Sequence, residues 1–120
     1  MGATYVTVSL SNLGKSLVPY SASFLVATGA IDCLAPGTAL REAGIGPEGK
    51  DVYELANGQP VECEFGFARV PFMGSETVAQ VIFGPDGAEP ILGVVALENV
   101  GIAVDPVSKT LTWMTAKALK

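Results

Sequence analysis

The feature that most constrains the fold is an apolar run that ends abruptly in a turn of small residues. The run spans Phe24–Ala27, the turn spans Thr28–Ala30, and a second, partly apolar segment follows at Ile31–Leu34. An apolar run bounded by turn residues predicts a buried strand that stops and presents its backbone at the turn. The same pattern also fits an ordinary core strand that ends at a Thr-Gly turn, so the rest of the chain has to decide between the two.

The composition predicts a single β-rich domain over residues 1–120. Hydrophobic residues make up 49% of the chain and charged residues 16%, with 14 Gly and 8 Pro. These proportions are typical of a compact, turn-rich fold and not of a disordered chain. A small chain this apolar is also expected to cover part of its surface in an oligomer.

The charged residues exclude several classes of function. The net charge is −5 and the chain has no histidine, so we expect no nucleic-acid partner, no Ser-His or Cys-His catalysis and no metal or other cofactor. No segment before Val6 resembles a signal peptide and no apolar run reaches membrane-spanning length, which predicts a cytoplasmic protein without a membrane partner. Cys33 and Cys63 are expected to be reduced and buried.

The N-terminal half predicts short strands and one short helix. Residues Thr4–Leu10 alternate between apolar and polar, as in a half-buried strand. The chain should return through a hairpin whose second arm contains Pro19. A short strand is expected at Cys33–Ala35, and one or two turns of helix at Ala39–Ala43.

Two further hairpins are expected. The first joins strands Asp51–Leu55 and Pro60–Phe67 through Asn57-Gly58, which predicts a type I′ turn with positive φ at both residues. A plain surface hairpin would give the same pattern. The second spans residues 70–83 around Gly74-Ser75, with an almost wholly apolar second arm in which Gln80 is the strongly polar residue.

The C-terminal part predicts a strand, a helix and two more strands. The apolar strand ends at Ile91-Leu92-Gly93, and a short helix follows over residues 94–100, closed by Gly101. Strands are expected at 102–104 and 110–114, and the tail Ala116–Lys120 is expected to fray.

These motifs together resemble the retropepsin-like aspartic proteases. The segments Asp32–Gly37 and Leu92–Glu98 are more similar to bacterial members of that family than to viral ones. With one residue changed, Leu25–Ala30 is the active-site signature Leu-Val-Asp-Thr-Gly-Ala of that family, with Ala27 in place of the catalytic aspartate. The hairpin at Asn57-Gly58 and the Ile91-Leu92-Gly93 tripeptide before a helix follow in the order of the family. The resemblance extends from about Val6 to Trp113. It implies an all-β fold, a closed orthogonal β-barrel with a flap hairpin and one short helix near the C-terminus.

The resemblance also implies a homodimer that cuts peptide or protein substrates. Each chain of such a protease supplies half of the site, and two carboxylates about 3 Å apart share one proton at the two-fold axis. By resemblance, Thr28 would bond across the axis and Gly29 would allow close backbone approach. With Ala27 in both copies the carboxylates are missing, so the chain as written is expected to be inactive.

The substrate-binding residues that the resemblance implies lie around the turn, at the flap tip, and before and within the Ile91-Leu92-Gly93 tripeptide. They are Ala30, Ile31, Asp32, Ala56, Asn57, Gly58, Pro85 and Ile91. Asp32 is expected to contact substrate and not to act as the base. Asp51, Asp86 and Asp105 are expected to be solvated.

Three interpretations therefore stand side by side. The first is an aspartic endopeptidase half-site made inactive at Ala27, and an otherwise intact motif with one changed residue is typical of a deliberate inactivation. The second is a natural pseudoprotease that binds extended peptides by strand addition, or dimerises, without cutting. The third is a β-barrel with no cleft function, which would make the ordered motifs a coincidence.

Overall fold

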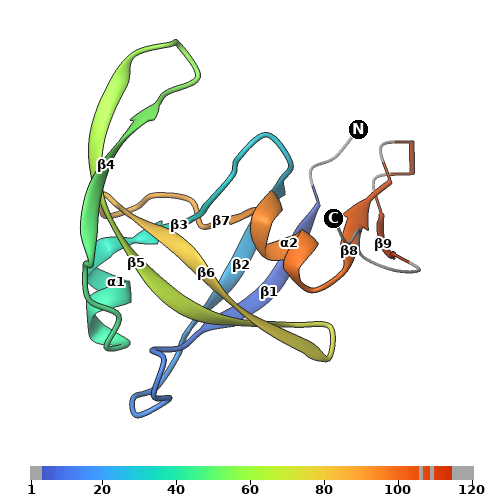
Figure 1. The fold of residues 1–120 in the computed structure, drawn as a ribbon, viewed down its shortest axis with the longest axis horizontal. Helices are drawn as coiled ribbons and strands as arrows, with labels where there is room; N and C mark the ends of the chain where they lie inside the picture. Colours follow the sequence, from blue (N-terminus) through green and yellow to red (C-terminus); the bar gives the residue numbers. More distant parts are fainter. Residues whose placement is uncertain (1–3, 106, 109, 115–120) are drawn as a thin grey trace, which may run out of the picture.

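The computed structural model describes residues 4–105, 107–108 and 110–114, and within them the chain is mostly β-strand (Figure 1). The strands are β1 (Tyr5–Leu10), β2 (Tyr20–Ala27), β3 (Cys33–Pro36), β4 (Gly49–Glu54), β5 (Pro60–Phe72), β6 (Ser75–Gly84), β7 (Ile91–Gly93), β8 (Ile102–Val104) and β9 (Leu111–Trp113). The helices are α1 (Gly37–Glu42) and α2 (Val94–Asn99). Neither is long or apolar enough to cross a membrane, and the same holds for any helix in the described residues.

The first seven strands form one mixed sheet in the order β1-β2-β7-β3-β6-β5-β4, while β8 and β9 pair separately. Strand β7 lies between β2 and β3, parallel to β2 and antiparallel to β3. An isolated bridge between Ser11 and Arg69 ties the end of β1 to β5. The all-β prediction is confirmed. In the described residues β1 and β4 are not paired with each other, so closure into a barrel stays a prediction.

The core lies where the alternating faces of the strands meet the two helices. Val8 and Leu10 of β1 are buried and Val6 packs against them, which confirms the predicted inward face of the first strand. Helix α1 buries Leu40, and α2 buries Leu97 on the same core. Burial of apolar side chains of this size contributes roughly 1.5–3 kcal/mol each before the entropy cost is counted.

The turn chemistry differs from the prediction at the β4–β5 hairpin. At the β4–β5 turn the Gly58 amide donates to the Leu55 carbonyl at 2.8 Å, and Gly58 has φ +85° whereas Asn57 has no positive φ. The predicted type I′ turn is therefore wrong here. Its geometry occurs instead between β5 and β6, where Met73 and Gly74 have φ of 51° and 84°. The Leu55 amide donates to the Gln59 carbonyl at 2.9 Å, so three residues lie between this pair. A hairpin loop of three residues needs one left-handed glycine, whereas a two-residue type I′ turn needs two residues with positive φ.

Several element boundaries also differ. Strand β2 begins at Tyr20, after Pro19, because the proline has no amide hydrogen to donate to the ladder. Strand β5 runs unbroken through 13 residues, where two separate segments were expected. Helix α1 begins at Gly37 and ends at Glu42, where Ala39–Ala43 was expected. Helix α2 is followed by Gly101, the predicted closing glycine, at φ +79°. The expected fraying of Ala116–Lys120 lies outside the described residues.

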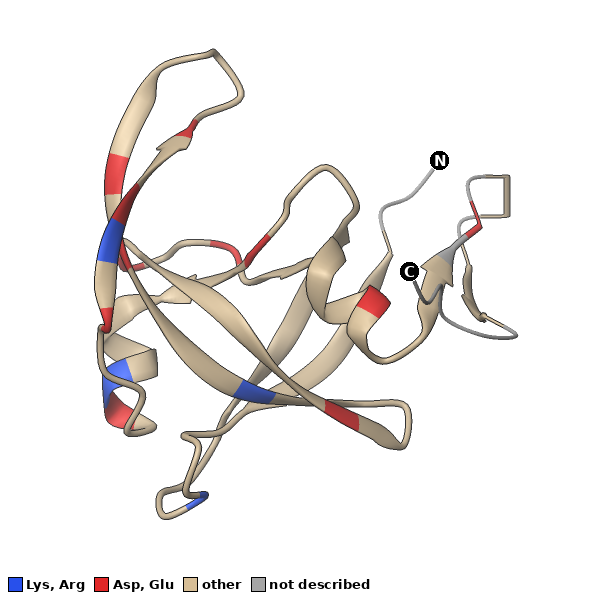
Figure 2. Cartoon of the chain, in the orientation of Figure 1, with Lys and Arg blue, Asp and Glu red and all other residues tan. Residues whose placement is uncertain are grey.

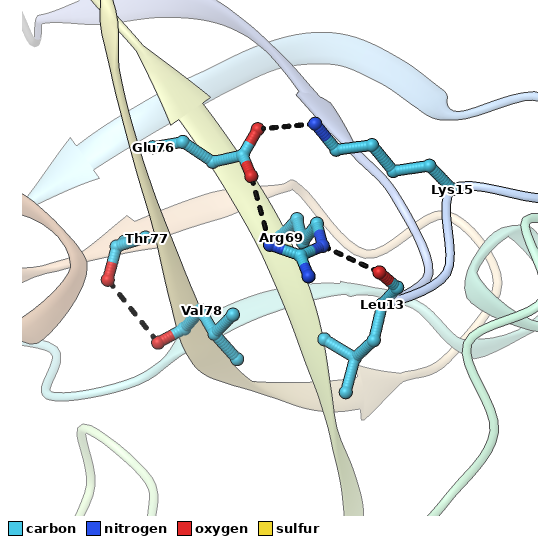
Figure 3. Close-up of polar contacts among 6 residues, drawn as sticks. All are labelled: Leu13, Lys15, Arg69, Glu76, Thr77 and Val78. Carbon is cyan, nitrogen blue, oxygen red and sulfur yellow. Dashed lines mark hydrogen bonds and ion pairs between the residues drawn. The ribbon is translucent and has the colours of Figure 1, made fainter.

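An exposed ion cluster fixes the loop between β1 and β2 against the β5–β6 hairpin (Figure 3). The Arg69 guanidinium donates to the Leu13 carbonyl at 2.6 Å and to Glu76 at 3.1 Å. The other oxygen of Glu76 accepts from Lys15 at 3.0 Å. Because Arg69 lies on β5, the loop is tied to the strand that also carries the β4–β5 hairpin.

Candidate active site

The Thr28-Gly29 turn lies at the end of β2 and in front of α2. Ala27 is the last residue of β2 and pairs with Gly93 on the parallel strand β7. The Ala30 amide donates to the Ala27 carbonyl at 3.1 Å, and the Ala30 carbonyl accepts from the Val94 amide at 2.8 Å. The turn is therefore held by backbone hydrogen bonds on both sides, to its own strand and to the start of the helix.

The outer side of this turn is exposed. Thr28 and Gly29 are both exposed, and a Cβ built on Gly29 would meet no atom within 4 Å. The neighbouring apolar side chains Ile31 and Val95 are 68% and 38% exposed. Packing within one copy of the chain therefore does not require a glycine at position 29. The apolar surface beside the turn is uncovered.

A cleft of about 610 Å³ lies between the residues after the turn and the β4–β5 hairpin. Its lining combines the loop 29–32 with β3, both strands of the hairpin and β6. The lining residues are Gly29, Ala30, Ile31, Asp32, Leu34, Asp51, Val52, Tyr53, Glu54, Leu55, Val61, Cys63 and Ile82.

Four predicted site residues thus line one cleft: Gly29, Ala30, Ile31 and Asp32. The others do not line it. Ala27 and Thr28 directly precede the lining residue Gly29 in the chain. Ala56, Asn57 and Gly58 form the exposed tip of the hairpin. Pro85 lines a separate depression with Lys50 and Glu64, and Ile91 is half-buried in the sheet, opposite Leu34.

The cleft is apolar with an acidic fringe. Its lining includes Asp32, Asp51 and Glu54 but no lysine or arginine. Figure 2 shows how few basic residues the described chain carries, with those nearest the hairpin on α1 and near the base of β4. A ligand in this cleft would therefore meet negative charge along with apolar surface.

Asp32 is held inside the cleft by two side chains from other elements. The Tyr53 hydroxyl, on β4, donates to Asp32 Oδ2 at 3.2 Å, and Gln80 Nε2, on β6, donates to the same oxygen at 3.3 Å. The Gln80 amide also donates to the Tyr53 hydroxyl oxygen at 3.0 Å. Since an amide NH₂ has two hydrogens and a hydroxyl can donate and accept at once, all three bonds can form together.

Burial changes the acidity of this group. It raises the pKa of Asp32 above its ordinary value, the hydrogen bond from Tyr53 opposes that rise, and the charge of Asp51 adds to it. The pKa of the Tyr53 hydroxyl is raised as well, chiefly by burial. Asp32 is thus a weaker acid than a solvated aspartic acid, because its charged form loses favourable hydration when it is buried.

Sequence reasoning missed Tyr53 and Gln80 as site residues. The register explains Gln80: Cys33 pairs with Val81 in the parallel ladder of β3 and β6, so the residues before them, Asp32 and Gln80, are level. The isolated polar residue in an apolar strand was the available signal. Nothing in the local sequence of β4 distinguishes Tyr53 from a surface tyrosine.

The two cysteines have different environments. Both are free, as predicted. Cys33 is buried, and burial raises its thiol pKa to about 11. The predicted burial of Cys63 is wrong, because it is half-buried and lines the cleft.

Solved structures show which fold this is. The structure is similar to a foamy viral protease-reverse transcriptase bound to an RNA/DNA hybrid, with a TM-score of 0.54 and 15% identity over 78% of this chain. The matched part is 12% of that viral chain. It is also similar to a retropepsin-like aspartic protease from Rickettsia conorii, with a TM-score of 0.52 and 21% identity over 92% of this chain and 88% of that one.

Comparison by sequence adds no relative. No protein-family model matches the chain, and no curated protein matches its sequence. The likeness therefore concerns the three-dimensional fold, and the fold of this chain is that of the retropepsin-like aspartic proteases.

Proposed function

We propose that the chain is the half-site of an aspartic endopeptidase of the retropepsin type, inactive as written because Ala27 stands in place of the catalytic aspartate. The observation that carries the proposal is the turn at the end of β2. Its Thr28-Gly29 pair follows Ala27 directly and adjoins a cleft under a projecting hairpin. This arrangement occurs in a fold that resembles an aspartic protease over 92% of the chain.

The proposed chemistry needs two carboxylates and one water. In a form with aspartate at position 27, the ionised carboxylate would remove a proton from water as the water oxygen attacks the peptide carbonyl carbon. The protonated carboxylate would give its proton to the carbonyl oxygen. Collapse of the tetrahedral intermediate breaks the C–N bond, and the amine leaves with a proton. An alanine methyl group can neither accept nor donate that proton.

In this proposal the second carboxylate comes from a second copy of the chain. Only one Thr-Gly-Ala turn is present in 120 residues, so we propose an isologous homodimer in which the two exposed turns meet. The exposed side chains Ile31 and Val95 support this, since a partner would cover apolar surface next to the turn. The two free cysteines fit a reducing, cytoplasmic compartment.

The substrate would be an extended peptide. The cleft is lined by both strands of the β4–β5 hairpin, for which we use the family term flap. In this proposal the peptide lies between the flap and the loop 30–32. Apolar side chains such as Leu34 and Ile82 would contact its side chains, and Asp32 would contact it at the polar end of the cleft.

The test is to restore the missing group. Ala27→Asp is expected to gain on the order of 10⁴-fold or more in peptide-bond hydrolysis over the parent chain, since loss of a catalytic group typically costs that much. Digestion of an unfolded protein from acid to neutral pH, followed by mass spectrometry, measures it. Ala27→Asn is the matched control, because it has the same shape and no ionisable carboxyl. Statine-type peptides should block the Asp form.

Sedimentation of the parent chain tests the dimer separately. The protein concentration should be roughly tens of micromolar, at which even weak association is detected. A monomer at that concentration would contradict the shared site. If the Asp form folds and dimerises yet cuts no more than the Asn form, the protease proposal fails. The other candidate, a peptide-binding module that does not cut, would then be the better explanation of a chain with alanine at position 27.

A further inference from the structure

Residues 50–62, the outer part of the flap, touch the body of the protein through very few polar side chains. Along β4 all residues are exposed except Gly49 and Tyr53, which are half-buried. Val52 and Leu55, on either side of Tyr53, are 62% and 47% exposed. Among residues 50–62, all of them described, Tyr53 is the one whose side chain hydrogen-bonds to another element.

The partners of Tyr53 belong to the fixed part of the cleft. Asp32 lies in the segment between the β2 turn and β3, and its neighbour Cys33 is buried in the core. Gln80 lies on β6, in the interior of the sheet between β3 and β5. Within residues 50–62 the flap is therefore joined to the body by side-chain hydrogen bonds at one point, inside the cleft. Beyond that range, Glu64 on β5 accepts from Arg41 of α1 at 2.8 Å, and β5 pairs with β6 from Phe65 onward.

The three bonds form a closed triangle and share one acceptor. Asp32 Oδ2 accepts from both Tyr53 and Gln80, while Gln80 also donates to the Tyr53 oxygen. Loss of the Tyr53 hydroxyl would leave Gln80 still bound to Asp32 but would remove the link to the flap. The Gln80–Tyr53 bond, at 3.0 Å, is the shortest of the three, and the two bonds to the Asp32 carboxylate, at 3.2 and 3.3 Å, are longer than ordinary charge-assisted bonds.

We propose that Tyr53 and Gln80 are positioning residues that act through Asp32: together they hold the flap in register with the loop that borders the cleft and fix the orientation of the Asp32 carboxylate. The position of the flap and the geometry of the polar end of the cleft are then set by one network. The part of this that concerns a bound peptide rests on the proposed function, whereas the coupling of flap to body does not.

The first test needs no substrate. In the parent chain with Ala27, Tyr53→Phe keeps the ring and removes the hydroxyl. Hydrogen exchange in a peptide covering residues 52–62 should become about three- to tenfold faster, because the variant loses both hydrogen bonds of the Tyr53 hydroxyl, to Asp32 and from Gln80. Alkylation of Cys63 by iodoacetamide should rise by a similar factor, since Cys63 lines the same cleft.

The molecule offers a matched control. Tyr5, on β1, donates to Glu89 at 2.9 Å, so Tyr5→Phe removes another tyrosine–carboxylate bond away from the flap. It should leave both flap readouts within twofold of the parent. Gln80→Met keeps the bond from Tyr53 to Asp32 and should raise both readouts less than Tyr53→Phe does. The double variant should match Tyr53→Phe alone, because both residues act through one network.

Two results would overturn the proposal. One is a Tyr53→Phe variant whose flap exchange and Cys63 alkylation match those of Tyr5→Phe. The other is faster exchange spread equally over the flap and over β1 and β2, with a matching loss of global stability, which would mark Tyr53 as an ordinary packing residue.

The second test uses the Ala27→Asp form and separates this proposal from the proposed function. If that form cuts peptides, adding Tyr53→Phe should raise KM about three- to tenfold with kcat within twofold, since a flap bond that acts equally on bound substrate and transition state affects KM. An unchanged KM would overturn the positioning role. If the Asp form does not cut, the protease proposal fails and the exchange experiment still decides whether Tyr53 holds the flap.

Discussion

Gly93 lies directly against the backbone of Asp32. A Cβ built on Gly93 would be 2.5 Å from the Asp32 carbonyl oxygen, and 2.6 Å from that of Ile31. The reason is topological: β7 ends between β2 and β3, where the chain leaves the turn and enters β3. A side chain at Gly93 would push the loop that carries Asp32 out of place.

We therefore expect Gly93→Ala to lower the free energy of unfolding by roughly 1–3 kcal/mol, because the methyl group meets backbone that cannot move aside. Urea unfolding with an unchanged m-value would measure this. Gly29→Ala is the control. It meets no atom within 4 Å and should stay within about 0.5 kcal/mol of the parent at low protein concentration. Equal losses in the two variants would contradict the packing argument.

Met73 occupies a backbone conformation that suits asparagine better. Its φ of 51° lies in the left-handed region, which costs a residue with a Cβ about 1–2 kcal/mol, and its side chain is 50% exposed. Met73→Asn should stabilise the protein by roughly 0.5–1 kcal/mol, because asparagine tolerates this region in type I′ turns. Met73→Ala removes the same side chain without relieving the backbone, so a thermal melt in which both variants gain equally would rule out the explanation.

Asp32 should make the protein less stable as pH rises. Burial raises its folded pKa above the ordinary value of 3.8, so the folded state holds the proton more tightly than the unfolded state. The stability from this group is present below that value and is lost as pH climbs through the folded pKa. Relative to Asp32→Asn, the parent should lose stability from about pH 4 upward.

The comparison with Asp32→Asn is needed because other groups act in the opposite direction. Lys15 lowers the pKa of Glu76, and backbone amides lower that of Asp105, so both gain stability as pH rises. These contributions cancel between two proteins that differ only at Asp32. Unfolding free energies of the two that run parallel from pH 3 to 7 would contradict the assignment.

The two thiols should react at very different rates. Cys63 is half-buried in the cleft, and Cys33 is buried with a pKa of about 11. A disulfide reagent at mild alkaline pH should titrate one thiol in the native protein and two in denaturant. The buried thiol should also make stability fall as pH rises from 9 through about 11, since the unfolded chain gives up the proton more easily. A Cys33→Ser variant that keeps the full fast-reacting signal identifies Cys63.

Local patterns in the sequence were enough to predict most strands and the turn at Thr28-Gly29. Alternation identified the inward face of β1, and the glycine before an apolar helix identified the end of β7. Those signals lie within a few residues of the feature that they predict. The same local reasoning failed at Asn57-Gly58, where the number of residues in the loop and not their identity selected the turn type.

Contacts between distant strands could not be read from the sequence. Tyr53 and Asp32 meet because β4 and the segment between β2 and β3 line the same cleft, and this depends on the register of three strands at once. Residues chosen at the hairpin tip, such as Asn57, proved to lie outside the cleft lining, while the strand residues beneath the tip form its wall.

The position of β7 has a consequence for how the chain folds. Strand β7 is made after β1 through β6, yet its place is in the middle of the sheet, with Val26 and Leu34 on its two sides. Until residues 91–93 arrive, β2 and β3 have no common neighbour, and the turn between them lacks its hydrogen bond from Val94. Such long-range pairing makes folding slow. The candidate site is thus completed only when β7 inserts, although every residue that lines the cleft precedes β7 in the chain.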